Sequence, residues 1–321
     1  MTRHSAVPPP VTAVLDASSR WLPARLGEVE QMLREQVAGH GETLAADAAM
    51  TLEAGGKRLR PMLVLLSAGA DAGESTVRAA TAIELIHMAT LVHDDVLDDA
   101  PLRRGRPTVG ATSGRGRATA TGDLLFSRAF ALLAVAGEQR AIELLASASV
   151  SLARGELAQR HDAYDTTIGE QRYLERCRLK TGALFECACR LGCDRKELGA
   201  FGAAIGLAFQ LLDDVLDVSG PPERTGKARG TDLLDGTVTL PLILAAERDP
   251  QIRAGDLRSL DSAEAAALCD RIEATGALRQ VRSRALEMVA EGKRSLGQAG
   301  FDAERRKLFD LVADGVVQRY S

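Results

Sequence analysis

Aromatic residues and net charge are both scarce in this 321-residue sequence, and each shortage limits what the protein can be. Aromatic side chains make up 3% of the chain and hydrophobic residues 45%, so aliphatic side chains must fill the core. This composition favours an all-α fold. The net charge of -4 arises from 40 basic and 44 acidic side chains and provides no general field for nucleic acid. Any anion-binding site must therefore be local.

The sequence also has little that indicates secretion or membrane insertion. Its five cysteines are an odd number, and Cys187, Cys189 and Cys193 lie in an alanine-rich stretch. We interpret these three as small core residues, with zinc ligands as the alternative. Residues 1–10 contain no apolar stretch of signal-peptide length, and apolar runs such as residues 201–212 are shorter than the ~18 residues of a membrane span. We expect a soluble, cytoplasmic protein without an integral membrane segment.

Strand-like alternation and fixed-period repeats are missing after about residue 21. Glycine, proline and short polar breaks instead separate helical patterns. We predict a disordered, proline-containing tail over residues 1–20 and one all-helical domain over residues 21–321. The expected helices cover residues 25–37, 43–52, 60–68, 77–99, 123–134, 142–159, 173–190, 196–218, 239–247, 263–273, 278–296 and 304–318.

Two of the expected helices are apolar nearly all round, at residues 79–92 and 201–212, which indicates burial inside a bundle. Each ends in aspartates: Asp94, Asp95, Asp98 and Asp99 before Pro101, then Asp213, Asp214 and Asp217 before Gly220. Carboxylates at a helix carboxyl end are unfavourable unless a cation binds them. Because Mg²⁺ typically uses few carboxylates plus substrate phosphates, the pair of clusters predicts magnesium bound with a phosphorylated substrate. A solvated acidic helix end is the alternative for either cluster alone.

Basic residues follow or precede these clusters in short loops. The segment at residues 55–61 combines two glycines with Lys57, Arg58 and Arg60 at the start of a helix, which suits an anion. Arg103, Arg104 and Arg106 follow the first acidic cluster, Lys227 and Arg229 follow the second, and Lys180 lies beside Thr181. Arg58, Arg106 and Arg229 can equally be solvated or paired with acids. Few aromatics and a negative net charge argue against a nucleic-acid groove.

In this order, the motifs closely resemble those of the trans-type polyprenyl diphosphate synthases, over nearly the whole chain after the tail. The resemblance is greatest to bacterial geranylgeranyl and medium-to-long-chain synthases. It rests on residues 55–61, 86–95, 103–105, 122–123, 180–181, 209–210 and 213–217. The resemblance implies an isoprenoid-synthase-type helical bundle with a central active-site cavity. It also implies condensation of isopentenyl diphosphate with an allylic diphosphate to a linear all-trans product and pyrophosphate.

Roles for individual residues come from the same resemblance. Asp94, Asp98 and Asp213, supported by Asp95, Asp214 and Asp217, would bind Mg²⁺, three ions with substrate present, from two facing helices. Arg103, Lys180 and Lys227 would neutralise the allylic diphosphate, and Thr181 and Gln210 would line the reaction centre. Isopentenyl diphosphate would be bound by Lys57, Arg60, His87 and Arg104. For His87, a histidine satisfied within its helix is the alternative.

Product length is predicted from the helix that precedes the first aspartates. In the resembled family bulky aromatics there go with short products, whereas this chain has Ile86, Ala89 and Thr90. We expect a product of twenty carbons or longer. One departure is Thr237, where the family usually has lysine, and Arg229 is the residue that could offset this loss.

Two other functions remain open at this point. A class I terpene cyclase also ionises allylic diphosphates, but it needs no isopentenyl site and normally has a different second metal motif. A non-catalytic partner subunit of a heteromeric prenyl synthase usually lacks one aspartate motif, and both are present here. A homodimer is expected from the resemblance.

Overall fold

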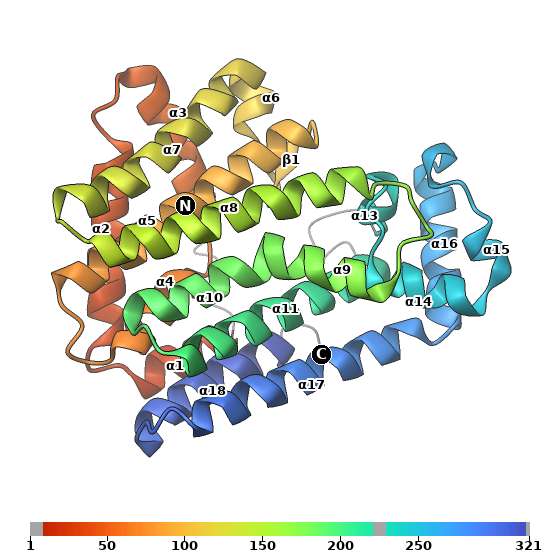
Figure 1. Ribbon diagram of the computed structural model, residues 1–321. Coiled ribbons are helices and arrows are strands. Elements are labelled where there is room, and N and C mark those ends of the chain that lie inside the picture. Colours follow the sequence, from red (N-terminus) through yellow and green to blue (C-terminus); the bar gives the residue numbers. More distant parts are fainter. Residues whose placement is uncertain (1–8, 221–228, 319–321) are drawn as a thin grey trace. The chain divides into compact units, whose positions relative to one another are not determined.

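The computed structural model describes residues 9–220 and 229–318, with only the backbone for residues 9–11. The described chain is predominantly helical, with one two-stranded antiparallel hairpin (Figure 1). The elements are α1 (Pro9–Ala17), α2 (Leu22–Val37), α3 (Glu42–Glu53), α4 (Leu59–Ala68), α5 (Glu74–Leu97), β1 (Leu102–Arg103), β2 (Arg106–Pro107), α6 (Val109–Ser113), α7 (Arg115–Val135), α8 (Gln139–His161), α9 (Glu170–Cys177), η1 (Arg178–Gly182), α10 (Ala183–Gly192), α11 (Lys196–Ser219), α13 (Thr231–Leu234), α14 (Leu240–Arg248), α15 (Pro250–Arg253), η2 (Leu257–Ser259), α16 (Ser262–Ala274), α17 (Ala277–Gly297) and α18 (Ala303–Gln318).

The predicted all-α fold is confirmed, and most predicted segments coincide with a helix to within a few residues at their ends, although α7 begins at Arg115, eight residues before the predicted start at 123. The segment predicted at residues 77–99 is α5, and the segment at 196–218 is α11. The segment at 173–190 is not one regular helix, because a π-helical turn, η1, joins α9 to α10. π-Helical turns are frequent at functional sites, and this one contains Lys180 and Thr181.

Two elements differ from the sequence-based expectation. Within the predicted disordered tail, residues from Pro9 to Ala17 form helix α1, and Val14 is fully buried. A helix can begin at proline because its first N–H groups have no partner within the helix. The hairpin was also missed, since its strands have two residues each. Arg104 and Gly105 form its turn with φ angles of 53° and 74°, as a tight two-residue hairpin loop requires.

Contacts divide the chain into two compact units. Unit 1 comprises Met1–Ser149, Cys187–Gly199 and Ala299–Val312. In unit 1, α5 packs against α2, α4 and α7, and α7 also contacts α3 and α6. The long contact between α5 and α7 can be followed in Figure 1. Ile83, Leu85 and Ile86 are fully buried, as expected for a helix that is apolar on all sides.

Unit 2 comprises Val150–Glu186, Ala200–Gln298 and Ala313–Ser321. Helix α14 packs against α9, α16 and α17, and η1 continues directly from α9. Phe185, Phe201 and Leu211 are fully buried in this unit. The single domain predicted for residues 21–321 stays a prediction.

Two described helices, α7 and α11, are long and apolar enough to cross a membrane by length and composition. Of the most apolar 18-residue window, 67% is buried in α11 and 33% in α7. Core helices of soluble proteins meet the same criterion. The expected lack of a membrane segment therefore stays a prediction. The five cysteines are all free thiols. Cys187 and Cys189 are buried, as predicted for core residues, whereas Cys193 is half-buried.

Candidate active site

The first aspartate cluster lies at the carboxyl end of α5 in unit 1. Asp94 is half-buried, Asp98 caps the helix, and the backbone N–H of Asp98 donates to the carbonyl of Asp94 over 2.8 Å. Asp95 is buried and accepts a 2.6 Å hydrogen bond from Nε of Arg103. Asp94 and Asp98 are one helical turn apart, so their carboxylates share a face of the helix.

Helix α7 supports this end of α5 through His93. The ring of His93 stacks on Phe126, and its Nε2 lies 3.3 Å from Oδ1 of Asp123. A Cβ at Gly122 would lie 2.2 Å from the same Nε2, so a residue with any side chain would clash there. Gly122 and Asp123 thus hold the ring of His93, the residue directly before Asp94, in one position.

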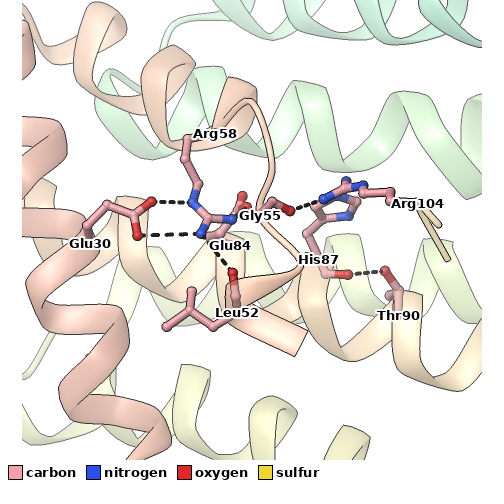
Figure 2. Close-up of polar contacts among 8 residues, drawn as sticks. All are labelled: Glu30, Leu52, Gly55, Arg58, Glu84, His87, Thr90 and Arg104. Atoms are coloured by element: carbon pink, nitrogen blue, oxygen red, sulfur yellow. Dashed lines mark hydrogen bonds and ion pairs between the residues drawn. The ribbon is translucent and has the colours of Figure 1, made fainter. Parts of the chain in front are cut away.

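Arg58 connects the glycine loop to the core of unit 1. Figure 2 shows its guanidinium between two carboxylates, Glu30 on α2 and Glu84 on α5. The distance from Nη1 to Oε1 of Glu84 is 2.9 Å, and the Glu84 side chain is 4% exposed. Burial acts to lower the pKa of Arg58, but Glu30 and Glu84 outweigh it and raise the pKa. Arg58 is therefore a structural ion-pair partner. This agrees with the sequence-based alternative that it pairs with acids.

The hairpin arginines bind the same loop through its backbone. Arg104 donates to the carbonyl of Gly55, and Arg106 donates to the carbonyl of Glu53 over 3.0 Å (Figure 2 shows Arg104). These contacts bring the segment after the first aspartates onto the loop before α4, although about fifty residues separate them in the sequence. Lys57, in the same loop, is exposed.

Cations surround His87 on α5. Burial lowers the pKa of His87 well below 6.5, and the charges of Arg60, Arg104, Arg103 and Arg58 lower it further. Burial also lowers the pKa of Arg60 to about 10, with Arg104 acting in the same direction and Glu84 against it. So many cations around one neutral imidazole favour binding of an anion. The family resemblance assigns Lys57, Arg60, His87 and Arg104 to one diphosphate, and these residues lie in the glycine loop, at the start of α4, on α5 and in the hairpin of unit 1.

A pocket of unit 1 lies beside this region. Its polar lining includes Asp95, Arg103 and Arg104, and its apolar lining comes from α3, α5, β2 and α6. The remaining lining residues are Met50, Thr51, Ala54, Leu91, Val92, Pro107, Thr108 and Val109. Charged and apolar side chains thus line the same pocket.

The second aspartate cluster lies near the carboxyl end of α11 in unit 2. Asp213 is exposed and Asp217 is half-buried, and Oδ2 of Asp217 accepts from the backbone N–H of Asp232 over 3.2 Å. Asp214 is 2% exposed and accepts hydrogen bonds from Tyr173 and Gln210. Burial, together with the charges of Asp232 and Asp213, raises the pKa of Asp214 to about 8, although the two hydrogen bonds act to lower it.

The π-helical turn η1 presents Lys180 and Thr181. Nζ of Lys180 lies 2.5 Å from Oε2 of Glu156 on α8, and the hydroxyl of Thr181 donates to Oε1 of Gln210 over 2.8 Å. A Cβ at Gly155 would lie 2.5 Å from the backbone nitrogen of Lys180, so α8 approaches the turn closely only because that residue is glycine. Burial would raise the pKa of Glu156, but Lys180 and Arg160 outweigh it and lower the pKa.

The remaining predicted binding residues of unit 2 have different outcomes. Lys227 lies outside the described residues. Thr237 is half-buried, and its N–H donates to the carbonyl of Asp232 over 2.8 Å. Arg229 pairs with Asp270 and Glu273 on α16, and its role in offsetting the missing lysine stays a prediction.

The three residues predicted to set product length all lie on α5. Ile86 and Ala89 are fully buried, and Thr90 is half-buried with its hydroxyl donating to the carbonyl of His87 over 2.8 Å. Small or aliphatic side chains thus occupy the interior of unit 1 one to two turns before Asp94.

Comparisons with known proteins agree with this arrangement. The family model described as polyprenyl synthetase matches residues 42–269. The chain belongs to this family. It is 41% identical over 279 residues to a protein of Geobacillus stearothermophilus named heptaprenyl diphosphate synthase component 2, covering 83% of this chain and 87% of that protein. A geranylgeranyl diphosphate synthase of Methanosarcina mazei is 31% identical over 84% of this chain and 87% of its own length.

Among solved structures, a polyprenyl synthase from Caulobacter crescentus in complex with calcium and isoprenyl diphosphate superposes with a TM-score of 0.89. The two chains are 33% identical, and the match covers 97% of this chain and 98% of that one. Both the family and the all-α fold predicted from the sequence are confirmed. The protein is a prenyltransferase.

The carboxylates of this polyprenyl synthetase fit magnesium by their chemistry. Every proposed ligand offers hard carboxylate oxygens, which Mg²⁺ prefers. Within residues 9–220 and 229–318, no group of three or more histidine, cysteine, aspartate or glutamate side chains is arranged to hold an ion by itself.

Three supporting residues of the synthetase were missed from the sequence. Glu84 is buried against Arg58, Glu156 pairs with Lys180, and Tyr173 donates to Asp214. A signal existed for each. Glu84 is an acid in an otherwise apolar helix, Glu156 follows a glycine within a helix, and Tyr173 is one of three tyrosines in the chain.

Proposed function

We propose that the protein condenses isopentenyl diphosphate with an allylic diphosphate and releases pyrophosphate, forming a linear all-trans polyprenyl diphosphate of twenty carbons or longer. The cations gathered around His87 support this proposal most directly. Joining two diphosphates requires a site for each, and unit 1 has a cationic region in addition to the carboxylates of α5. A cyclase acts on one diphosphate and has no use for the second site.

Each group of residues has a distinct task in this proposal. The isopentenyl diphosphate is bound by Lys57, Arg60, His87 and Arg104. The allylic diphosphate is bound by Arg103, Lys180 and Lys227, while Thr181 and Gln210 line the reaction centre. Asp94, Asp98 and Asp213 bind Mg²⁺, about three ions with substrate present, and Asp95, Asp214 and Asp217 orient these ligands.

The reaction breaks the allylic carbon–oxygen bond, and the isopentenyl double bond then attacks the allylic carbon. Magnesium, when bound, supplies positive charge that stabilises the departing pyrophosphate. The arginines and lysines act in the same way from the protein side. A proton then passes from the new chain to the released pyrophosphate, and no protein nucleophile is required.

The direct test is incubation of the purified protein with isopentenyl diphosphate and each allylic starter, with and without Mg²⁺. We expect chain elongation that depends on both diphosphates and on the metal. Asp98→Asn should abolish elongation, whereas Asp99→Asn should retain it, because Asp99 is exposed and pairs with Arg115. Absence of elongation with every starter would overturn the proposal, and a cyclic product from the allylic substrate alone would identify a cyclase.

Product length has its own test on α5. Ala89→Phe should shorten the product, because the added ring would occupy buried space before Asp94. Ala80→Phe is the matched control, since Ala80 is equally buried but lies nine residues earlier on the opposite face of the helix. Chromatography of the products would contradict the assignment if Ala89→Phe caused no shift or both variants caused the same shift.

Assembly also remains a proposal. The resemblance favours a homodimer, whereas the relative from Geobacillus stearothermophilus and one from Bacillus subtilis, 37% identical, are both named component 2 of a heptaprenyl diphosphate synthase. Light scattering of the purified chain, combined with its activity alone, separates the two. A chain that is active and dimeric supports the homodimer, and a chain that is active but monomeric contradicts it. We propose the cytoplasm as its location.

A further inference from the structure

A chain of hydrogen bonds in unit 2 connects a buried tyrosine to both residues proposed at the reaction centre. Tyr173 on α9 donates from its hydroxyl to Oδ2 of Asp214 on α11. Nε2 of Gln210 donates to Oδ1 of the same carboxyl over 2.8 Å, and the hydroxyl of Thr181 donates to Oε1 of Gln210 over 2.8 Å. We call Tyr173, Asp214, Gln210 and Thr181 the relay.

The first member of the relay is a residue to which neither the motifs nor the proposed function assigns a role. Tyr173 is 1% exposed, and its ring packs in the interior of unit 2. A phenylalanine would fill nearly the same volume, so packing alone does not require the hydroxyl. A buried hydroxyl needs a hydrogen-bond partner, and the Tyr173 hydroxyl donates to Asp214, with the Cys177 thiol as a second neighbour.

The relay determines which end of the Gln210 side chain faces Thr181. An amide has donors on one atom and an acceptor on the other. Because Nε2 is directed at Asp214, Oε1 faces Thr181, and the hydroxyl hydrogen of Thr181 points towards Gln210. The lone pairs of the Thr181 oxygen then remain available to a positive charge outside the relay.

We propose that Tyr173 is a positioning residue for prenyl transfer, acting through Asp214 and Gln210 on the hydroxyl of Thr181. The inference rests on the proposed function, because it assumes that Thr181 and Gln210 face the reacting atoms. Tyr173 holds one oxygen of the Asp214 carboxyl, which fixes the torsion of that group and directs its other oxygen at Gln210. Without the hydroxyl, the carboxyl and the amide can rotate, and Thr181 loses its fixed orientation.

Steady-state kinetics of Tyr173→Phe test the inference, with Tyr164→Phe as the matched control. Tyr164 is another tyrosine of unit 2, and its ring packs beside Gly236 and Arg258, which are not relay residues. We expect Tyr173→Phe to lower kcat roughly tenfold, as for loss of one hydrogen bond to an ionisable group, with both KM values within about twofold. Tyr164→Phe should keep the wild-type kcat.

A double-mutant comparison distinguishes positioning from a general loss of structure. If Tyr173 acts through Thr181, adding Tyr173→Phe to Thr181→Val should lower kcat no further than Thr181→Val alone. Multiplied effects of the two substitutions would overturn the inference. If the wild-type enzyme elongates chains and Tyr173→Phe has the same kcat, the inference is wrong but the proposed function stands.

A second measurement needs neither substrate nor metal. In protein labelled with ¹⁵N-glutamine, the side-chain amide signals of Gln210 can be assigned by their loss in Gln210→Glu. We expect these signals to shift or broaden in Tyr173→Phe and to stay unchanged in Tyr164→Phe. Unchanged signals in both variants would show that the hydroxyl does not hold the amide, whatever the protein's activity. Failure of the wild-type enzyme to elongate any starter would instead reject the proposed function.

Discussion

Replacing Arg58 with methionine should destabilise unit 1 much more than it weakens substrate binding. The Arg58 side chain is 13% exposed, and its loss leaves the carboxylate of Glu84, 4% exposed, without this cation. A buried charge that loses one of its cations costs about 3 kcal/mol even with Arg60 still nearby, whereas Glu30, at 30% exposure, adds little. At about 2 °C per kcal/mol for a chain of this size, the melting temperature should fall by about 6 °C.

Methionine keeps the backbone strain at this position unchanged, because Arg58 adopts a φ of 47° that any side chain resists. The loss therefore reports the ion pairs rather than the turn. Adding Glu84→Gln to Arg58→Met should recover about half of the lost stability, since the buried group is then neutral. Arg25→Met, which breaks a surface pair with Glu28, should change stability by less than about 0.5 kcal/mol.

Thermal and urea unfolding measure these differences, and initial rates give the KM for isopentenyl diphosphate. A stability loss as small as that of Arg25→Met, accompanied by a KM raised tenfold or more, would refute the reasoning. That result would make Arg58 a substrate ligand rather than the residue that anchors the glycine loop.

Three further predictions concern both units. The pKa of His87 in the folded protein lies below 6.5, so the free energy of unfolding should fall as the pH drops below about 6.5. The unfolding midpoint of His87→Gln should depend less on pH between about 7 and 5 than that of the wild-type protein. Equal pH dependence of the two proteins would contradict this. Glu156→Gln should lower the KM for the allylic diphosphate by up to about fivefold by releasing Lys180, and an unchanged KM would count against that role. Gly155→Ala should destabilise the protein by about 1 to 3 kcal/mol in urea unfolding, whereas Gly116→Ala, which has open space around it, should not.

Helical periodicity made most of this fold predictable from the sequence. The two nearly all-apolar segments became α5 and α11, because side chains with no polar face have no favourable position at a surface. The aspartates of each cluster were predicted as metal ligands because carboxylates are unfavourable at the carboxyl end of a helix. Family resemblance then connected Lys57, Arg60, His87 and Arg104, and the structure places these residues in one region of unit 1.

Long-range pairing could not be predicted in the same way. Nothing near Arg58 in the sequence indicates Glu30 or Glu84, which lie 28 and 26 residues away. The π-helical turn at Lys180 packs closely against Gly155 in another helix, a contact that the local pattern does not reveal, and that pattern predicted a regular helix. Strands of two residues in the hairpin are too short for any alternation to be visible.

The cations assigned to substrate already have partners in the protein, and this affects how binding should be understood. Lys180 contacts Glu156, Arg103 contacts Asp95, and Arg104 contacts the carbonyl of Gly55. A diphosphate must replace or share these contacts, so the measured affinity is a difference between two sets of interactions. The internal partners hold long side chains in place before substrate arrives, which reduces the entropy lost on binding. Removing such a partner should therefore strengthen the attraction between the cation and the diphosphate, and it should also leave the cationic side chain less well positioned. For Glu156→Gln, a lower KM should come with a lower kcat.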